Sequence, residues 1–159
     1  MTGCINVQPG ELHIARRPTV MKTILGSCIG VTFWSPRTGA AALCHCVLPC
    51  CPPDASTAER SRYVDGAIRY VAQCFDRWGI SRRELQIRIF GGADVLPSSP
   101  RARRPTIGTM NRDRAVQVLA EEGFSILARD VGGTRGRTIQ FDTATGEVWS
   151  RRLARLAEQ

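Results

Sequence analysis

Residues 28–34 read Cys-Ile-Gly-Val-Thr-Phe-Trp, and residues 40–47 read Ala-Ala-Ala-Leu-Cys-His-Cys-Val. In the first stretch large apolar residues occupy every second position, which is the pattern of a β-strand with one buried face. The segment between them, Ser35-Pro36-Arg37-Thr38, has the composition of a turn. The two stretches are therefore predicted to form an antiparallel hairpin, around which the rest of the fold is organised.

The register of this hairpin decides which side chains meet. If Trp34 pairs with Gly39, Cys28 lies directly opposite His45 on the same face of the sheet. The isoleucine, valine and phenylalanine of the first strand then point to the opposite face, which is the expected core face. The two cysteines that flank the histidine join them there. A slip of one residue would separate thiol from imidazole, so this register is a prediction.

The remaining chain shows helix and strand patterns without a repeat. Helices are predicted from the capping box Ser56-Thr57-Ala58-Glu59 to Gly79, and from Asn111, as a helix cap, to Glu122. Further strands are predicted over residues 11–17, 20–25, 85–90, 124–131, 137–142 and 147–152. This order predicts one α+β domain over residues 1–159, in which largely antiparallel or mixed β-sheet layers are flanked by two main helices, an α/β/β sandwich. Residues 1–10 are interpreted as an N-terminal arm and 153–159 as a C-terminal tail.

Composition limits the cellular setting. The 159 residues are 43% hydrophobic and 23% charged, as in ordinary globular proteins. No apolar run approaches the roughly 18 residues of a membrane helix, and the N-terminus has neither the basic nor the apolar region of a signal peptide. We therefore expect cytoplasmic residence without membrane insertion, and cysteines that are mostly reduced thiols.

The charge balance bears on partners. The net charge of +8 comes almost entirely from arginine, because Lys22 is the only lysine. This excess favours an acidic partner, although a genome that prefers arginine codons gives the same composition. Aromatic residues make up only 6%, and no zinc-finger or base-stacking motif is visible. A nucleic-acid partner is therefore not expected.

Cys28 is the first candidate for chemistry. It follows Gly26 and Ser27 at a tight strand entry, where backbone N–H groups can point at an oxyanion. An imidazole beside a thiol can lower the thiol pKa from its usual value of about 8.5 and later act as a general acid. The residues alone leave two interpretations open: a cysteine–histidine catalytic pair, and a cysteine that is only a small buried apolar residue.

A zinc or redox site is the main rival interpretation. Four cysteines lie close to His45 in the sequence: Cys44, Cys46, Cys50 and Cys51. In a strand the two flanking cysteines face away from His45, and Pro49 separates the other two from it, which is unfavourable for a tetrahedral site. No metal and no other cofactor is therefore expected. The pairs Gly91-Gly92 and Gly132-Gly133 match neither P-loop nor dinucleotide spacing and are interpreted as turns near a site.

The order of these motifs resembles the chemoreceptor glutamine deamidases (CheD) of bacterial chemotaxis, from about Val20 to Trp149. The resemblance is carried by Leu25-Gly26-Ser27-Cys28, His45 with Leu48-Pro49, Gly91-Gly92-Ala93, Ile107-Gly108 with Asn111, Gly132-Gly133-x-Arg135-x-Arg137, and Phe141-Asp142 with Thr145-Gly146. It implies an α+β cysteine hydrolase that converts glutamine side chains of methyl-accepting receptors to glutamate and ammonia. Cys28 would be the nucleophile that forms a thioester, His45 the base and acid, and the backbone near Gly26 and Ser27 the oxyanion site.

The resemblance also implies partners and a third catalytic residue. The partners are the cytoplasmic helices of the receptors and, for some members, a CheC-type phosphatase. The third catalytic residue of the family is a threonine six positions before the cysteine, where this chain has Lys22. Thr23 takes that role if a bulge near Gly26 shifts the strand by one residue, and otherwise points to the wrong face. The alternative function is a non-catalytic module of the same fold that docks on receptors or on the phosphatase.

Overall fold

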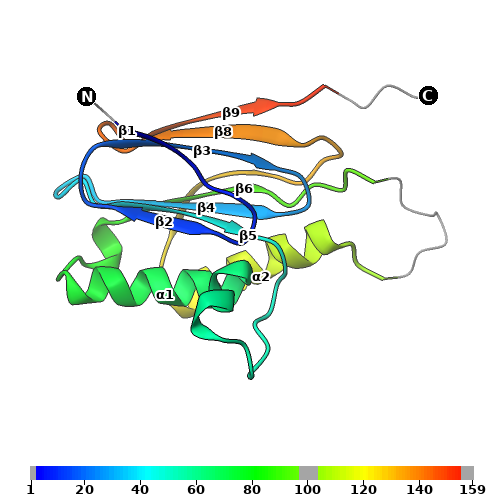
Figure 1. Ribbon diagram of the computed structural model, residues 1–159, viewed down its shortest axis with the longest axis horizontal. Coiled ribbons are helices and arrows are strands. Elements are labelled where there is room, and N and C mark those ends of the chain that lie inside the picture. Colours follow the sequence, from blue (N-terminus) through cyan, green and yellow to red (C-terminus); the bar gives the residue numbers. More distant parts are fainter. Residues whose placement is uncertain (1–2, 97–103, 155–159) are drawn as a thin grey trace.

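The computed structural model describes residues 3–96 and 104–154 and has three layers (Figure 1). The outer sheet has the order β1-β3-β8-β9 and is built from β1 (Gly3–Asn6), β3 (Thr19–Leu25), β8 (Arg137–Asp142) and β9 (Glu147–Arg152). The central sheet has the order β2-β5-β4-β6-β7 and is built from β2 (Leu12–Ala15), β4 (Ile29–Trp34), β5 (Ala41–Cys46), β6 (Gln86–Gly91) and β7 (Ile126–Val131). The third layer holds α1 (Val64–Arg77) and α2 (Ile107–Glu121), with the short 3₁₀ helices η1 (Thr57–Arg62) and η2 (Arg82–Glu84). The predicted α+β class is confirmed.

The central sheet is buried on both faces. Its helix-facing side carries alternate residues of β4 and β5, packed against α1 and α2: Ile29, Val31, Phe33, Ala42, Cys44 and Cys46. Its other side packs against the outer sheet through Leu43, Met21 and Phe141. Fully burying such a side chain stabilises the fold by about 1.5–3 kcal/mol. The core face predicted for the hairpin is confirmed, and the opposite face lines the space between the two sheets.

The β4–β5 hairpin is paired two residues away from the predicted register. Trp34 pairs with Ala41 rather than with Gly39, which belongs to the turn and has a φ of 77°. His45 consequently lies opposite Gly30. Because side chains alternate with a period of two, this shift leaves every side chain on its predicted face. The predicted opposition of Cys28 and His45 is therefore wrong, and Cys28 lies outside the ladder, which ends at Ile29 and Cys46.

Both main helices begin elsewhere than predicted. Ser56 accepts a hydrogen bond from the Glu59 N–H at 3.3 Å, but the helix that it caps is the 3₁₀ helix η1, and α1 begins only at Val64. Helix α2 begins four residues before Asn111, because the Thr106 hydroxyl accepts from the Thr109 N–H at 3.1 Å and caps it. Asn111 is therefore no cap but a residue inside the helix.

Parts of the predicted arm and tail contact the rest of the chain. Within the predicted arm, residues 3–6 form β1, which pairs in parallel with β3. Val7 follows it and is buried. Within the predicted tail, the Leu153 N–H donates to the Gly136 carbonyl at 2.8 Å, and residues 155–159 lie outside the described residues. Among residues 3–96 and 104–154, no helix has both the length and the apolar character needed to cross a membrane.

Candidate active site

The predicted site residues lie between the two sheets. Thr23 belongs to β3 of the outer sheet, His45 belongs to β5 of the central sheet, and Cys28 immediately precedes β4, the neighbour of β5. Thr23 and His45 are almost fully buried, with exposed fractions of 5% and 2%, whereas Cys28 is partly exposed. The site is therefore built across the two sheets, and the thiol is its most accessible part.

His45 is held by Thr23 and by the backbone of Val7. The Thr23 hydroxyl oxygen lies 2.6 Å from His45 Nδ1 and 2.6 Å from the Val7 carbonyl oxygen. A carbonyl oxygen can only accept, so the hydroxyl donates its one proton to Val7 and accepts from the Nδ1–H of His45. This arrangement selects the imidazole tautomer whose Nε2 is unprotonated and able to take up a proton.

Thr23 reaches His45 without a bulge. The β3–β8 ladder runs from Val20 to Leu25 without a register shift. Thr23 faces inward, whereas Ile24 beside it is 63% exposed. The expectation that Thr23 needs a bulge is wrong. It assumes that Thr23 and Cys28 lie on one continuous strand, so that the face of Thr23 can be counted from Cys28. Strand β3 lies in the other sheet and meets His45 across the space between the sheets.

The environment of Cys28 favours the protonated thiol. Its side chain packs against Leu25, Phe90 and Ile139. Burial raises the pKa of the thiol, and the charge of Arg62 and the backbone N–H of Cys28 only partly oppose this shift. In the resting structure the thiol pKa is therefore raised, not lowered as expected. Within the described residues, no hydrogen bond joins Cys28 to His45.

The environment of His45 favours the neutral imidazole. Burial lowers its pKa, opposed by the Val7 carbonyl and by the charge of Glu11. At neutral pH the resting pair is a thiol and a neutral imidazole rather than a thiolate and an imidazolium. Chemistry at Cys28 therefore requires a proton transfer to a base at the moment of attack.

The Gly26-Ser27-Cys28 bend is held by its three carbonyl oxygens. The Gly26 carbonyl accepts from the Ala93 N–H at 2.9 Å, and the Cys28 carbonyl accepts from the Gly92 N–H at 2.8 Å. The Ser27 carbonyl accepts from Asn111 Nδ2 at 2.9 Å. Over the described part of the chain, the N–H groups of Ser27 and Cys28 donate to no other backbone carbonyl. The Cys28 N–H is near enough to the sulfur of the same residue to lower the thiol pKa.

The glycines of two motifs permit this bend. Gly91 has a φ of 96°, and a Cβ there would lie 2.3 Å from the Cys28 carbonyl oxygen. A Cβ at Gly108, on the first turn of α2, would lie 2.5 Å from the Ala93 carbonyl oxygen. Larger residues would displace the segment that holds Cys28. The interpretation of Gly91-Gly92 as a turn beside the site agrees with this geometry.

Two residues that contact the site, Val7 and Asn111, are not among the site residues predicted from the sequence. Val7 contributes a backbone carbonyl, so its side chain carries no signal of the role. Asn111 is fully buried inside α2, and its Nδ2 also donates to the Val47 carbonyl at 3.0 Å. It lies four residues before the buried Ala115. A polar residue on the apolar face of a helix is the signal that could have identified it.

The cysteines near His45 are separated by the fold. Cys44 and Cys46 are fully buried on the helix-facing side, as predicted, and burial raises the pKa of both thiols. Cys50 and Cys51 lie in the segment between β5 and η1. In residues 3–96 and 104–154, no three His, Cys, Asp or Glu side chains lie close enough together to hold a metal ion.

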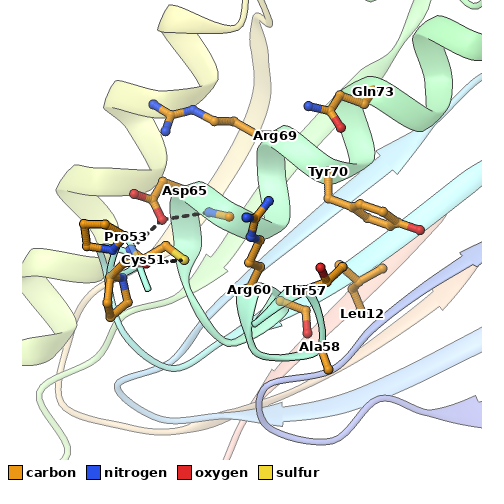
Figure 2. Close-up of a pocket in the computed structure, with 13 residues that line it drawn as sticks. Leu12, Cys51, Pro53, Thr57, Ala58, Arg60, Asp65, Arg69, Tyr70 and Gln73 are labelled. Carbon is orange, nitrogen blue, oxygen red and sulfur yellow. Dashed lines mark hydrogen bonds between the residues drawn. The ribbon is translucent and has the colours of Figure 1, made fainter. Parts of the chain in front are cut away.

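Of two cavities in the described part of the chain, one is lined by His45 and the other by Cys51, and neither is lined by Cys28. One of about 410 Å³ is lined by Thr23 and His45, together with residues 6–9, Lys22 and Ile24. A larger one of about 510 Å³ lies beside η1 and α1 and contains Cys51 (Figure 2). There the Asp65 carboxylate accepts from the Cys51 N–H at 2.8 Å, and no histidine lines the cavity. The Cys51 thiol therefore has no imidazole base, in contrast to the site around His45.

Comparison with known proteins shows the family of the chain. The family model described as CheD chemotactic sensory transduction matches residues 47–152, more than half of the chain. A probable chemoreceptor glutamine deamidase CheD 2 of Geobacter sulfurreducens is 46% identical over 151 residues, which cover 95% of this chain and 91% of that relative. A probable chemoreceptor glutamine deamidase CheD of Maridesulfovibrio salexigens is 36% identical, with 91% of this chain and 88% of the relative covered. The chain belongs to the CheD family.

Proposed function

We propose that this protein is an enzyme that hydrolyses the side-chain amide of selected glutamines on methyl-accepting chemotaxis receptors, giving glutamate and ammonia. The observation that carries the proposal is the 2.6 Å contact between the Thr23 hydroxyl and His45 Nδ1, which places the proton of a neutral imidazole on Nδ1 and leaves Nε2 unprotonated. A nucleophile, a base and a group that orients the base are the parts of a cysteine hydrolase. The names of the relatives, chemoreceptor glutamine deamidases, support the substrate.

The first half of the reaction forms a thioester. His45 Nε2 takes the proton of the Cys28 thiol while the sulfur attacks the carbonyl carbon of the glutamine amide. The N–H groups of Ser27 and Cys28 stabilise the oxyanion, since within the described residues they donate to no backbone carbonyl. His45 then returns its proton to the amide nitrogen, the C–N bond breaks, and ammonia leaves.

The second half regenerates the thiol. His45, neutral again, takes a proton from a water molecule, whose oxygen attacks the thioester carbon. The C–S bond breaks, the proton on His45 goes to the departing sulfur, and the new carboxylic acid ionises to glutamate. Thr23 accepts from Nδ1 throughout and stabilises the imidazolium that forms in each half.

Partners and location belong to the same proposal. The net charge of +8 suits docking on acidic, glutamate-rich receptor helices, because opposite charges steer association. Cytoplasmic residence follows from that substrate. A CheC-type phosphatase as a second partner is supported by the family resemblance alone. The non-catalytic alternative was motivated by Lys22, and it loses that support because Thr23 makes the contact with His45.

The test is deamidation of a receptor fragment by the purified protein. Wild type should release ammonia and convert glutamine to glutamate, as detected by mass spectrometry, and Cys28→Ala should do neither. Cys51→Ala is the matched control, because it removes a partly exposed thiol from the cavity that lacks an imidazole, and it should keep wild-type activity. Equal yields from wild type and Cys28→Ala would show that the protein is not a cysteine deamidase.

A further inference from the structure

We propose that Asn111 is a positioning residue that fixes the nucleophile segment relative to the histidine strand, an inference that rests on the proposed function. Its side-chain amide nitrogen donates to the Ser27 carbonyl at 2.9 Å and to the Val47 carbonyl at 3.0 Å. Ser27 directly precedes Cys28, and Val47 follows His45 by two residues. One NH₂ group thus joins the segment that carries the thiol to the segment that carries the imidazole.

The position of this link explains why it is needed. The β4–β5 ladder ends at the pair Ile29–Cys46, so no rung of the ladder holds the residues beyond it. Ser27 and Val47 lie just past that last pair, where each segment is bonded to other parts of the chain but no ladder pair joins the two directly. Asn111 supplies the missing connection from α2, whose first turn is packed closely against the Gly92 and Ala93 carbonyls at Gly108.

The orientation of the amide is set by its partners. Both partners are carbonyl oxygens, so only the NH₂ end can face them, and a flipped amide would place oxygen against oxygen. The Oδ1 atom is buried and has no hydrogen-bond partner in the described part of the chain. A buried acceptor without a partner is unfavourable. Asn111 therefore donates to both carbonyls while its Oδ1 atom stays unbonded. A residue that only packed the helix would not be expected to leave a buried oxygen in this state.

If Asn111 is a positioning residue, replacing it should lower kcat even in variants that remain folded. A misplacement of about 1 Å between catalytic groups can reduce the rate by about a hundredfold. Asn111→Asp has nearly the same shape, but its carboxylate would repel both carbonyls. Asn111→Ser is neutral and too short to reach both. Both variants should lower kcat for deamidation by between about tenfold and a hundredfold, with KM little changed because Asn111 is fully buried and does not touch the substrate.

The pH profile separates positioning from a structural role. A protonated carboxyl can donate one hydrogen bond, so kcat of Asn111→Asp should recover as the pH falls, opposite to wild type. Val118→Ala is the matched control, since Val118 is equally buried on the same helix but contacts the hydrophobic core. It should lose stability in urea unfolding and keep wild-type kcat.

Two results would overturn the inference. One is a kcat of Asn111→Ser equal to that of Val118→Ala at comparable stability, which would make Asn111 structural. The other is an Asn111→Asp profile parallel to wild type, or, if that variant does not fold, an Asn111→Ser variant that folds with wild-type kcat. Failure of the proposed function itself is distinguishable, because then the wild type and Val118→Ala would also release no ammonia from the receptor fragment.

Discussion

Replacing Thr23 by valine tests how His45 is oriented. Valine has nearly the shape of threonine, so the packing between the sheets is kept while the hydroxyl is lost. The hydroxyl holds both His45 Nδ1 and the Val7 carbonyl at 2.6 Å. Nδ1 itself lies 3.4 Å from the same carbonyl oxygen, so a small rotation lets it donate there directly. The variant should therefore keep the productive tautomer but hold the ring less firmly.

The size of the effect follows from that substitute contact. A hydrogen bond of this kind is worth about 0.5–1.5 kcal/mol net, and about 1.4 kcal/mol corresponds to a factor of ten in rate. We expect kcat of Thr23→Val to fall about tenfold, far less than the loss on removing the imidazole in His45→Ala. The unfolding free energy should fall by about 1 kcal/mol. Thr23→Ser restores the hydroxyl and should keep kcat within about threefold of wild type, since the oxygen is retained.

The assay is ammonia release from a receptor fragment under saturating substrate, beside urea unfolding of each variant. A wild-type kcat for Thr23→Val would show that the contact does not orient His45 for catalysis. A kcat as low as that of His45→Ala would show that the Val7 carbonyl cannot replace the hydroxyl. Either result refutes the reasoning from the three distances.

Four further predictions concern the bend, the two titrations and the core. Gly91→Ala should lower both activity and stability, because its Cβ would lie 2.3 Å from the Cys28 carbonyl, whereas Gly39→Ala, with nothing within 4 Å, should cost about 1–2 kcal/mol of stability and no activity. Because burial lowers the pKa of His45, the acid limb of the kcat/KM profile should lie below the usual imidazole value of about 6.5, and the stability present above that pH should be lost as the pH falls toward the folded-state pKa. The rate of Cys28 alkylation by iodoacetamide should reach half its maximum above about pH 8.5, since burial raises the thiol pKa. A midpoint near neutral pH would contradict a protonated Cys28 thiol in the resting enzyme. Cys44→Ala should lower the unfolding midpoint and leave kcat unchanged, because that thiol packs against the helices.

The hairpin shows why much of the fold could be predicted. Alternation fixes the face of each strand residue independently of its exact partner, so an error of two residues at Trp34 still leaves His45 on the predicted face, with Gly30 and Thr32. Every observed strand except β1 is predicted from the sequence, and the predicted ends lie within about two residues of those observed, because each strand is bounded by turn residues. Strand β1 reads Gly-Cys-Ile-Asn, and its two apolar residues are adjacent, so it shows no alternation.

The remainder of the site could not be read from local pattern. Thr23 faces His45 only because β3 joins a different sheet from β4, and sheet membership is set by long-range packing. The Val7 contact uses a backbone carbonyl, which every residue has, so the residue type does not predict it. Asn111 looked like a helix cap because asparagine favours caps, but Thr106 takes that place and leaves Asn111 buried beside Ser27.

The central claim is that Cys28 forms a thioester with a receptor glutamine, and interception of that thioester tests it most directly. With hydroxylamine present during the reaction, the wild-type protein should convert glutamine into a glutamyl hydroxamate on the receptor fragment, detected by mass spectrometry, because the amine attacks the thioester in place of water. Cys28→Ala should give no hydroxamate, and Cys51→Ala as much as wild type. Glutamate formation without any hydroxamate, or the same hydroxamate yield from Cys28→Ala, would contradict a thioester on Cys28.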